Sequence, residues 1–481
     1  MMNKEAVTYR DFVHSEVQRS PRLARLLEHL EERPRNPSTI VSIEYPRGEQ
    51  SAPKFRMVNE SELANVIRDT SALHGRILCV ENTHGPITSL VGEALDIDPV
   101  FFAGYIITDF EDIEKAPPPP SLALFPTEIS RRGYLHFHYQ QILDLGSSIA
   151  LQHTPYNLKS CANISRNVRR LPPLSGRQLA LGRTCCSMVL KRLHDTWTCL
   201  ILIDPPITNI ITNIELSTSQ KAYPSRLLHG GLAGLLRPVS FSEFKSGTGA
   251  PQLDETSMLE CLLHFFRASP PRFKANHPIT LSLCYYPMRV VLGHWNYYTH
   301  LMSRYFKFYE YALHDIENRV HDSDITDLQR WRRRSMQSQH KLLLLTEFIH
   351  YWLQQERLDT SKQCWSLVLR DIKHLQSQLN HYNRSLERMI PVAASMVQLL
   401  DSRRSMVEAA NISRLTFIAL VFVPLSWVAS LFSMSDGYSP GDKYFWVYFV
   451  TAMPTLLVVV FLSALRVDNF TALLRRTAAR L

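Results

Sequence analysis

The sequence contains none of the short motifs that indicate a common enzyme chemistry. A phosphate-binding P-loop, a G-x-S-x-G nucleophile turn and an H-E-x-x-H zinc motif are all absent from the 481 residues. The glycine-rich stretch at 230–234 does not have the spacing of a dinucleotide-binding fingerprint. We therefore expect a protein that is not an enzyme.

Two further absences concern the cellular compartment. The first twenty residues contain no apolar stretch, so we expect no secretory signal peptide. The eight cysteines are scattered, and no two of them have the C-x-x-C spacing. This distribution is typical of a reducing compartment rather than of a disulfide framework.

The average composition is that of an ordinary globular protein. Charged residues make up 20% of the chain and hydrophobic residues 45%, and the mean hydropathy is −0.12. These values exclude a collagen, a disordered chain and a membrane protein with many spans. The net charge of +9 is a mild excess over this length, so we expect no nucleic acid as a partner.

Two local apolar runs depart from this average. Leu415–Met434 has 20 residues without a charge, 15 of them apolar, and Tyr444–Leu465 has 22 residues without a charge, 18 of them apolar. A bilayer core of about 30 Å needs about 20 residues of helix. The runs predict two transmembrane helices, and the lipid bilayer is then a partner; core helices of a soluble protein are the alternative.

Basic residues flank this hairpin on one side. Arg403, Arg404 and Arg414 precede the first run, and four arginines follow the second, whereas the short loop between the runs carries two acids and one lysine. By the positive-inside rule, both termini are cytoplasmic and the loop faces outside. The chain is thus predicted to cross a membrane twice, with the plasma membrane favoured.

The rest of the pattern predicts an α+β membrane protein, with an N-terminal cytosolic α/β domain, long stalk helices and two C-terminal transmembrane helices. Short buried strands are expected at Arg76–Glu81, Gly133–Leu143 and Thr196–Ile203, and helical spacing dominates after residue 255. The predicted parts are a polar and helical extension (1–70), the α/β domain (71–255), long helices and stalk (256–414), transmembrane helix 1 (415–434), an outer loop (435–443), transmembrane helix 2 (444–465) and a basic cytosolic tail (466–481).

The stretch Phe422–Ser435, FVPLSWVASLFSMS, resembles the end of the first transmembrane helix in CorA-type magnesium transporters. Pro424-Leu425-Ser426 matches the Pro-Leu-Thr/Ser element of that family. Its Gly-Met-Asn motif falls on Ser433-Met434-Ser435, so that only the methionine is kept. Glu93–Phe102 and His136–Gly146 are similar to segments of the fungal CorA-like branch.

This resemblance implies a homopentamer whose first span lines a central pore and whose outer mouth binds hydrated Mg²⁺. It implies transport of a divalent cation, with Mg²⁺ as the transported or regulatory ion and with copies of the chain as partners. Because the motif at the mouth is degenerate, a non-conducting, membrane-anchored subunit with an interaction or regulatory role is the alternative.

A pore face can be read from the spacing of residues on the first span. Seven residues separated by three or four positions share one side of a helix, which is apolar at the cytosolic end and hydroxyl-bearing at the outer end. These residues are Ile412, Leu415, Ala419, Val423, Ser426, Ser430 and Ser433. The alternative is a packing stripe, because small residues let membrane helices approach closely whether or not ions pass.

Other polar residues are candidates for metal contacts. Ser433, Met434, Ser435 and Asp436 would form the outer mouth, with Asp436 as an acidic ring or as a solvated loop residue. The acidic run Asp109, Glu111, Asp112 and Glu114 is a candidate for cytosolic metal sensing, against a solvated turn. His136 and His138 share one face of a strand, where a structural role is favoured over a zinc site, and Asp98 could bind metal or cap a helix.

Overall fold

The computed structural model describes residues 7–48, 52–107, 125–151, 154–193, 195–212, 222–228, 240–247, 254, 256–314, 322–355, 362–434 and 440–461. The chain divides into two compact units. The first consists of Met1–Ala312 and Ser323–Ile390, and the second of Leu313–Asp322 and Pro391–Leu481.

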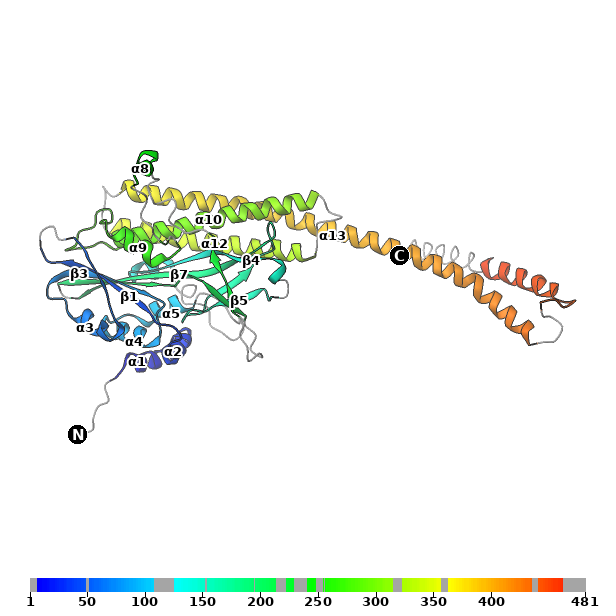
Figure 1. Cartoon of the computed structure of the whole chain (residues 1–481), viewed down its shortest axis with the longest axis horizontal. Coiled ribbons are helices and arrows are strands. Elements are labelled where there is room, and N and C mark those ends of the chain that lie inside the picture. Colours follow the sequence, from blue (N-terminus) through cyan, green and yellow to red (C-terminus); the bar gives the residue numbers. More distant parts are fainter. Residues whose placement is uncertain are drawn as a thin grey trace, which may run out of the picture. The chain divides into compact units, whose positions relative to one another are not determined.

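An 11-stranded mixed sheet forms the centre of the first unit (Figure 1). The strands are β1 (Thr39–Pro46), β2 (Lys54–Met57), β3 (Leu73–Glu81), β4 (Tyr134–Ser147), β5 (Asn157–Ser160), β6 (Asn167–Arg170), β7 (Arg177–Leu193), β8 (Thr196–Ile203), β9 (Asn209–Thr212), β10 (Ala222–Pro224) and β11 (Arg226–Leu227). Their order is β10-β9-β5-β6-β7-β8-β3-β1-β2, while β4 pairs with β7 and β11. The pair β3–β8 is parallel, and the other pairings between described strands are antiparallel.

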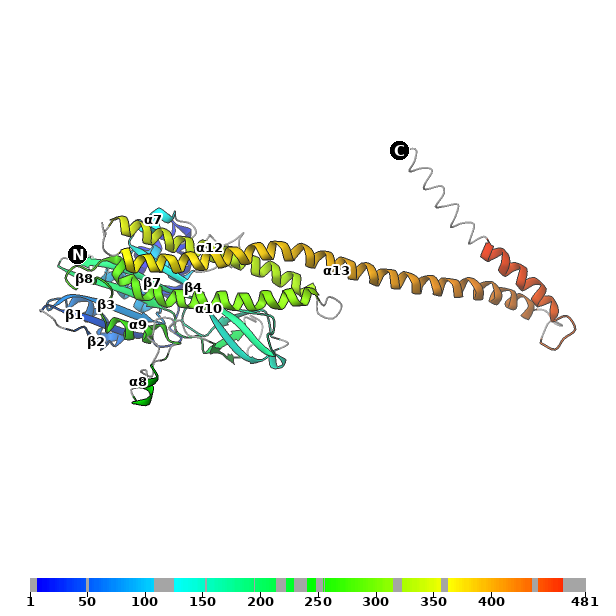
Figure 2. The ribbon, with the colours of Figure 1, turned by 90° about the horizontal axis from the view of Figure 1, so that it is seen from above.

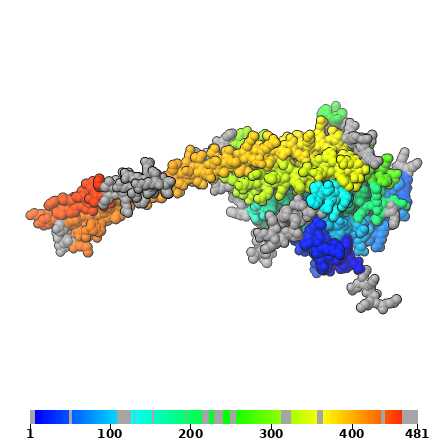
Figure 3. All heavy atoms as spheres, turned by 180° about the vertical axis from the view of Figure 1, so that it is seen from behind, coloured from blue at the N-terminus to red at the C-terminus, as the bar shows by residue number. Residues whose placement is uncertain are grey.

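Helices cover both faces of this sheet, which makes the first unit a three-layer sandwich. One face carries α1 (Tyr9–Val17), α2 (Ala24–Glu31), α3 (Leu63–Arg68), α4 (Gly85–Ala94) and α5 (Pro99–Ile106), with short 3-10 turns at Pro21–Leu23 and Glu60–Glu62. The other face carries α9 (Met258–Phe266), α10 (Thr280–His314), α12 (Asp322–Gln355) and the first part of α13 (Lys362–Ser433). The three long helices run side by side in Figure 2, and Figure 3 shows α1 and α2 on the side of this unit away from them. Shorter elements are α7 (Pro126–Arg131), α8 (Phe241–Lys245) and a 3-10 turn at Ile149–Leu151.

Because both faces are covered, the central strands are buried on both sides, and their burial does not alternate along the strand. All eight residues of β8 are buried. On the side of α1–α5, Leu200 and Leu202 pack in one core with Phe101 and Phe102. Among the long helices, Trp331 is fully buried, and its ring centroid lies 5.2 Å from that of Tyr305.

The second unit contains the C-terminal part of α13 and a shorter apolar helix, Trp446–Phe461. Each helix has one buried residue in this unit's apolar stretch, Val428 at 3% exposed and Ala452 at 2% exposed. The rings of Phe432 and Tyr448 meet edge to face, with centroids 6.2 Å apart. In the part of the chain that the structure describes, α13 is the one helix long and apolar enough to cross a membrane.

These elements confirm the predicted fold class: a mixed α/β domain, long helices, and a long apolar C-terminal helix followed by a shorter one. β8 has the bounds predicted for the strand at Thr196–Ile203, β3 contains the predicted Arg76–Glu81, and β4 covers the predicted Gly133–Leu143 except for its first residue. The stalk and the first apolar run are one continuous helix, α13, because no glycine interrupts it over 72 residues. The second predicted span, Tyr444–Leu465, continues past the described residues.

The structure differs from the sequence analysis at the N-terminal extension. Residues 39–46, placed outside the α/β domain by their polar surroundings, form β1, which pairs with β3 over eight positions from Thr39 to Pro46. Ile40, Val41 and Ile43 are buried there. Burial of these apolar side chains stabilises the strand, so the first 48 residues include part of the domain itself.

Candidate ion pathway

The seven residues of the predicted pore face all lie on α13 and are all exposed. Ile412 is 64% exposed, Leu415 69% and Val423 66%. The three serines of the set occupy the last two turns of the helix, where Ser433 is its final residue. The helix therefore carries apolar residues along the first part of this line and hydroxyl-bearing residues along its last part.

The side of α13 that packs against the second apolar helix lies opposite the predicted pore face. Val428 is the residue of α13 that is buried against the helix Trp446–Phe461, and Val421, Leu425 and Phe432 are half-buried on the same side. Val428 is two positions from both Ser426 and Ser430. Since each residue of an α-helix advances about 100°, two positions correspond to about 200°, and the serines lie opposite Val428.

The position of the serines argues against a packing stripe within the chain's own hairpin. A stripe of small residues that served the chain's own hairpin would face the second apolar helix. The bulkier Val428 and Leu425 lie at that contact instead, together with Pro424 and Leu420, which are also half-buried. The small and hydroxyl-bearing side chains therefore take no part in the contact within the hairpin.

The larger apolar side chains of this helix outside the predicted pore face divide into two groups. Leu420 and Leu425 are half-buried toward the second helix. Phe417, Trp427 and Leu431 are 62%, 61% and 49% exposed. Exposed bulky apolar side chains on a helix of this length are what a lipid environment accommodates.

The outer mouth is described only in part. Ser433 ends α13 and Met434 follows it, 84% exposed, whereas Ser435 and Asp436 lie outside the described residues. The acidic run Asp109, Glu111, Asp112 and Glu114 also lies outside them. Within the described ranges, no group of three His, Cys, Asp or Glu side chains is arranged to hold a metal ion.

Two candidates in the α/β domain have structural partners. Asp98 caps α5, where its Oδ1 accepts from the Val100 N–H at 2.9 Å, and its Oδ2 pairs with Arg132 at 3.0 Å. The Nδ1 of His136 lies 2.7 Å from the Ser187 hydroxyl. Burial lowers the pKa of His136 to about 3, helped by the positive charge of Arg166, so its imidazole is neutral.

The sequence patterns did not predict the buried ion pair at the centre of the domain. Arg166 forms a two-pronged ion pair with Asp204, and both side chains are almost fully buried, at 2% and 3% exposed. The available signal was the position of Asp204, which directly follows the fully apolar β8 and precedes Pro205-Pro206. A carboxylate at the end of such a strand needs a nearby partner if it is buried.

The long helices that lead into an apolar hairpin define a membrane protein with its membrane-spanning part near the C-terminus. Residues 299–466 match the model of a protein family described as "CorA-like Mg2+ transporter protein". The matched stretch contains α12, α13 with the predicted pore face, and the helix Trp446–Phe461, so the similarity to this family covers the C-terminal third of the chain.

The other comparisons are with whole chains. No curated protein matches the sequence. Among solved structures, the chain is similar to "The complete structure of CorA magnesium transporter from Methanocaldococcus jannaschii", with 9% identity, coverage of 88% of this chain and 96% of the other, and a TM-score of 0.37. It is also similar to the full-length CmaX protein, with 12% identity, coverage of 90% and 98%, and a TM-score of 0.36.

Proposed function

We propose that the protein is a CorA-like, homopentameric channel that carries Mg²⁺ or a related divalent cation across a membrane. The observation that carries the proposal is the placement of the face from Ile412 to Ser433 opposite the contact with the chain's own second apolar helix. In a ring of copies, this face can point to a common axis while the second helix stays outside. Both termini are cytoplasmic in this proposal, and the plasma membrane is favoured.

The chemistry of the face suits a hydrated ion. Mg²⁺ gives up its water reluctantly, so a pathway for it can hold the hydrated ion with neutral oxygens and needs no charge in its wall. The hydroxyls of Ser426, Ser430 and Ser433 supply such oxygens, and Val423, Ala419 and the residues below them form an apolar constriction. The membrane potential drives a divalent ion with about 4.6 kcal/mol per 100 mV.

The proposal gives the remaining polar residues a role at the two ends of the pathway. Ser435 completes the outer ring with Ser433 and Met434, and Asp436 concentrates cations at the mouth. On the cytosolic side, Asp109, Glu111, Asp112 and Glu114 are the candidates for sensing Mg²⁺. Within the hairpin, the bulky residues that face away from the axis contact lipid.

The test is transport by the purified full chain. We expect a Mg²⁺-sensitive dye inside liposomes to report uptake that depends on the protein and on a negative internal potential. Native mass spectrometry of the same preparation should give five copies per particle. Properly inserted protein that carries no divalent cation would overturn the channel, and a monomer in mild detergent would overturn both the pore and the pentamer.

The alternative function, a non-conducting anchored subunit, is favoured by one observation, the Ser-Met-Ser sequence in place of Gly-Met-Asn. An asparagine amide offers a carbonyl acceptor and two donors, whereas a serine hydroxyl is shorter and presents a single oxygen. A ring of serines is therefore wider and holds a hydrated cation less firmly. The two functions differ in what restoring the motif should do.

We expect the double substitution Ser433→Gly with Ser435→Asn to raise Mg²⁺ uptake by about tenfold, which corresponds to about 1.4 kcal/mol of ion stabilisation. Uptake of Mg²⁺ in the liposome assay measures the change. Ser439→Asn is the matched control, because it adds the same amide to the same loop outside the motif, and it should leave uptake unchanged. A double variant that inserts and assembles but transports nothing would favour the non-conducting subunit.

A further inference from the structure

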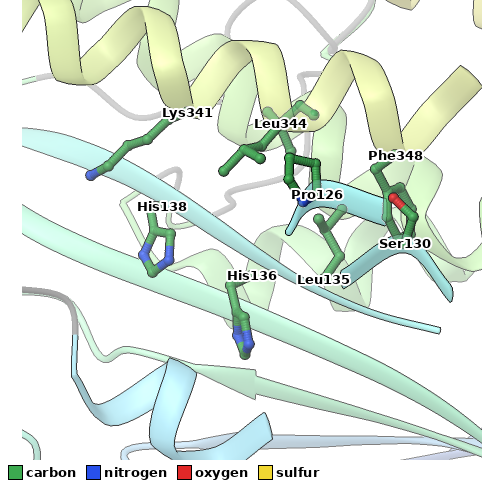
Figure 4. A pocket seen from close by; sticks show the side chains of 9 residues that line it. Pro126, Ser130, Leu135, His136, His138, Lys341, Leu344 and Phe348 are labelled. Carbon is green, nitrogen blue, oxygen red and sulfur yellow. The ribbon is translucent and has the colours of Figure 1, made fainter. Parts of the chain in front are cut away.

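A cavity of about 40 Å³ lies in the first unit between β4 and α12 (Figure 4). One part of its wall is apolar and the other is polar. The apolar residues are Pro126, Leu135, Leu344, Leu345 and Phe348, and the polar residues are Ser130, His136, His138 and Lys341. None of the described residues that line it is an acid.

Lys341 is the unusual member of this wall. Its side chain runs from α12 to the end of the cavity where the His138 ring lies (Figure 4). In the described part of the chain, the Lys341 ammonium group has no hydrogen bond and no ion pair. On the same helix, Arg330 pairs with Asp327, and Arg332 pairs with Glu387. The Lys341 side chain is half-buried, and an anion beside its ammonium group would accept a charge-assisted hydrogen bond that no described residue of the wall accepts.

The surroundings of Lys341 are cationic rather than anionic. The pKa of Lys341 is lowered to about 8, first by burial and then by the positive charge of Arg183, while the Cys185 thiol acts in the other direction. Arg183 itself is largely buried on β7, and burial lowers its pKa to about 10, followed by the charge of Arg334. At neutral pH, Lys341 is still mostly protonated, so the cavity has a positive potential.

His138 offers a second hydrogen-bonding group on the same side. Its Nε2 is buried and has no hydrogen-bond partner. Burial lowers the pKa of His138 far below its ordinary value, and the charge of Lys341 lowers it further, so the ring is neutral and carries one N–H. With the proton on Nε2, the ring and the Lys341 ammonium present two donors to one acceptor.

We propose that this cavity is a binding site for a small carboxylate anion with a short alkyl chain. One oxygen of the ligand accepts from the Lys341 ammonium and the other from the Nε2–H of His138, and the alkyl part lies on Leu344, one helical turn from Lys341. A water-sized group needs about 10–15 Å³ of cavity volume, so the cavity holds about three to four such groups. That size fits acetate and excludes nucleotides and long fatty acids.

Acetate is the probe for the first experiment, which uses the full chain in detergent. The thermal unfolding temperature is followed during a titration with sodium acetate, in which sodium chloride keeps the ionic strength constant. We expect a saturable rise, because a ligand that binds only the folded protein stabilises it in proportion to the logarithm of its concentration over Kd. A wild-type protein whose unfolding temperature does not respond to acetate, or responds equally to chloride, overturns the proposal.

Substitutions then assign the site. Lys341→Met keeps the length of the side chain and removes the charge, and it should weaken acetate binding by at least about tenfold. Lys307→Met, on the exposed side of α10, is the matched control and should bind acetate as the wild type does. His138→Phe should also weaken binding, and it tests the site independently if Lys341→Met does not fold. Unchanged acetate binding in folded Lys341→Met or folded His138→Phe overturns the assignment.

Discussion

Replacement of Asp204 by asparagine is expected to lower the free energy of unfolding of the sheet-bearing unit by about 3–5 kcal/mol. The substitution keeps the size of the side chain and removes its charge. The guanidinium group of Arg166, 2% exposed, would then be buried without its counter-ion. A buried charge that loses its partner pays the full cost of leaving water, which is why the effect exceeds that of an ordinary hydrogen bond.

The contacts of Asp204 explain why this site matters to the whole unit. Its carboxylate accepts from Arg166 Nε at 2.7 Å and Nη2 at 2.8 Å, from the Tyr105 hydroxyl at 2.8 Å and from the Cys185 N–H at 2.7 Å. Arg166 also donates to the Ile106 carbonyl at 3.1 Å. Burial by itself would lower the pKa of Arg166, but the neighbouring Asp204 raises it above its ordinary value. The pair therefore connects β8, β7 and the end of α5.

Hydrogen exchange is the appropriate measurement, because a chain of two units need not unfold in one step. The amide protons of β7 and β8, among them that of Cys185, should exchange about two hundredfold to five thousandfold faster in the Asp204→Asn variant. Glu28→Gln breaks the exposed pair of Arg25 and Glu28 and is the matched control, with an expected change within about 0.5 kcal/mol. A loss below about 1 kcal/mol at Asp204 would show that the pair contributes little.

The elements of the fold that depend on residues within their own segment can be predicted from the sequence. The strand β8 is a run of eight β-branched, aromatic and aliphatic residues that ends at Asp204-Pro205-Pro206, and each of these features is local. The helix α13 follows from 72 residues without glycine. Its two prolines do not end it, because a single lost backbone hydrogen bond does not outweigh the turns on both sides.

Other elements depend on partners that are distant in the sequence. The strand β7 has 17 residues, including a glycine and four cationic side chains, and no simple alternation. It is a strand because it pairs with β4, β6 and β8, and that pairing is not encoded within the segment. The same holds for β1, whose burial depends on β3.

In the candidate site, too, some features follow from local sequence and others from packing with distant segments. Spacing alone placed Ile412, Ala419 and Ser426 on one line of a helix, because the period of an α-helix is fixed. The rotation of that line relative to the second apolar helix depends on packing, which buries Val428 and brings the rings of Phe432 and Tyr448 together. The approach of Lys341 to His138 likewise requires α12 to lie on β4, and nothing in either segment predicts it.

Rotation about the helix axis also gives the sharpest test of the pore. Ala419 belongs to the proposed pore face, and Ile418 is one residue earlier, about 100° around the helix and 52% exposed. Both lie at the same depth on α13. Ala419→Trp in a ring of copies would place one indole per subunit at the constriction, whereas Ile418→Trp would place each indole away from the axis.

We therefore expect Ala419→Trp to lower divalent-cation uptake to the level of empty liposomes, a loss of more than about a hundredfold, because bulky apolar side chains at a constriction exclude water and ions together. Ile418→Trp should keep uptake within about twofold of the wild type, since a lipid-facing position tolerates an apolar ring. Uptake of Mg²⁺ by liposomes that contain equal amounts of assembled protein measures both. Equal uptake by the two variants would contradict the assignment of this face, because a line of residues that borders the ion's path cannot tolerate an indole as readily as the residue beside it.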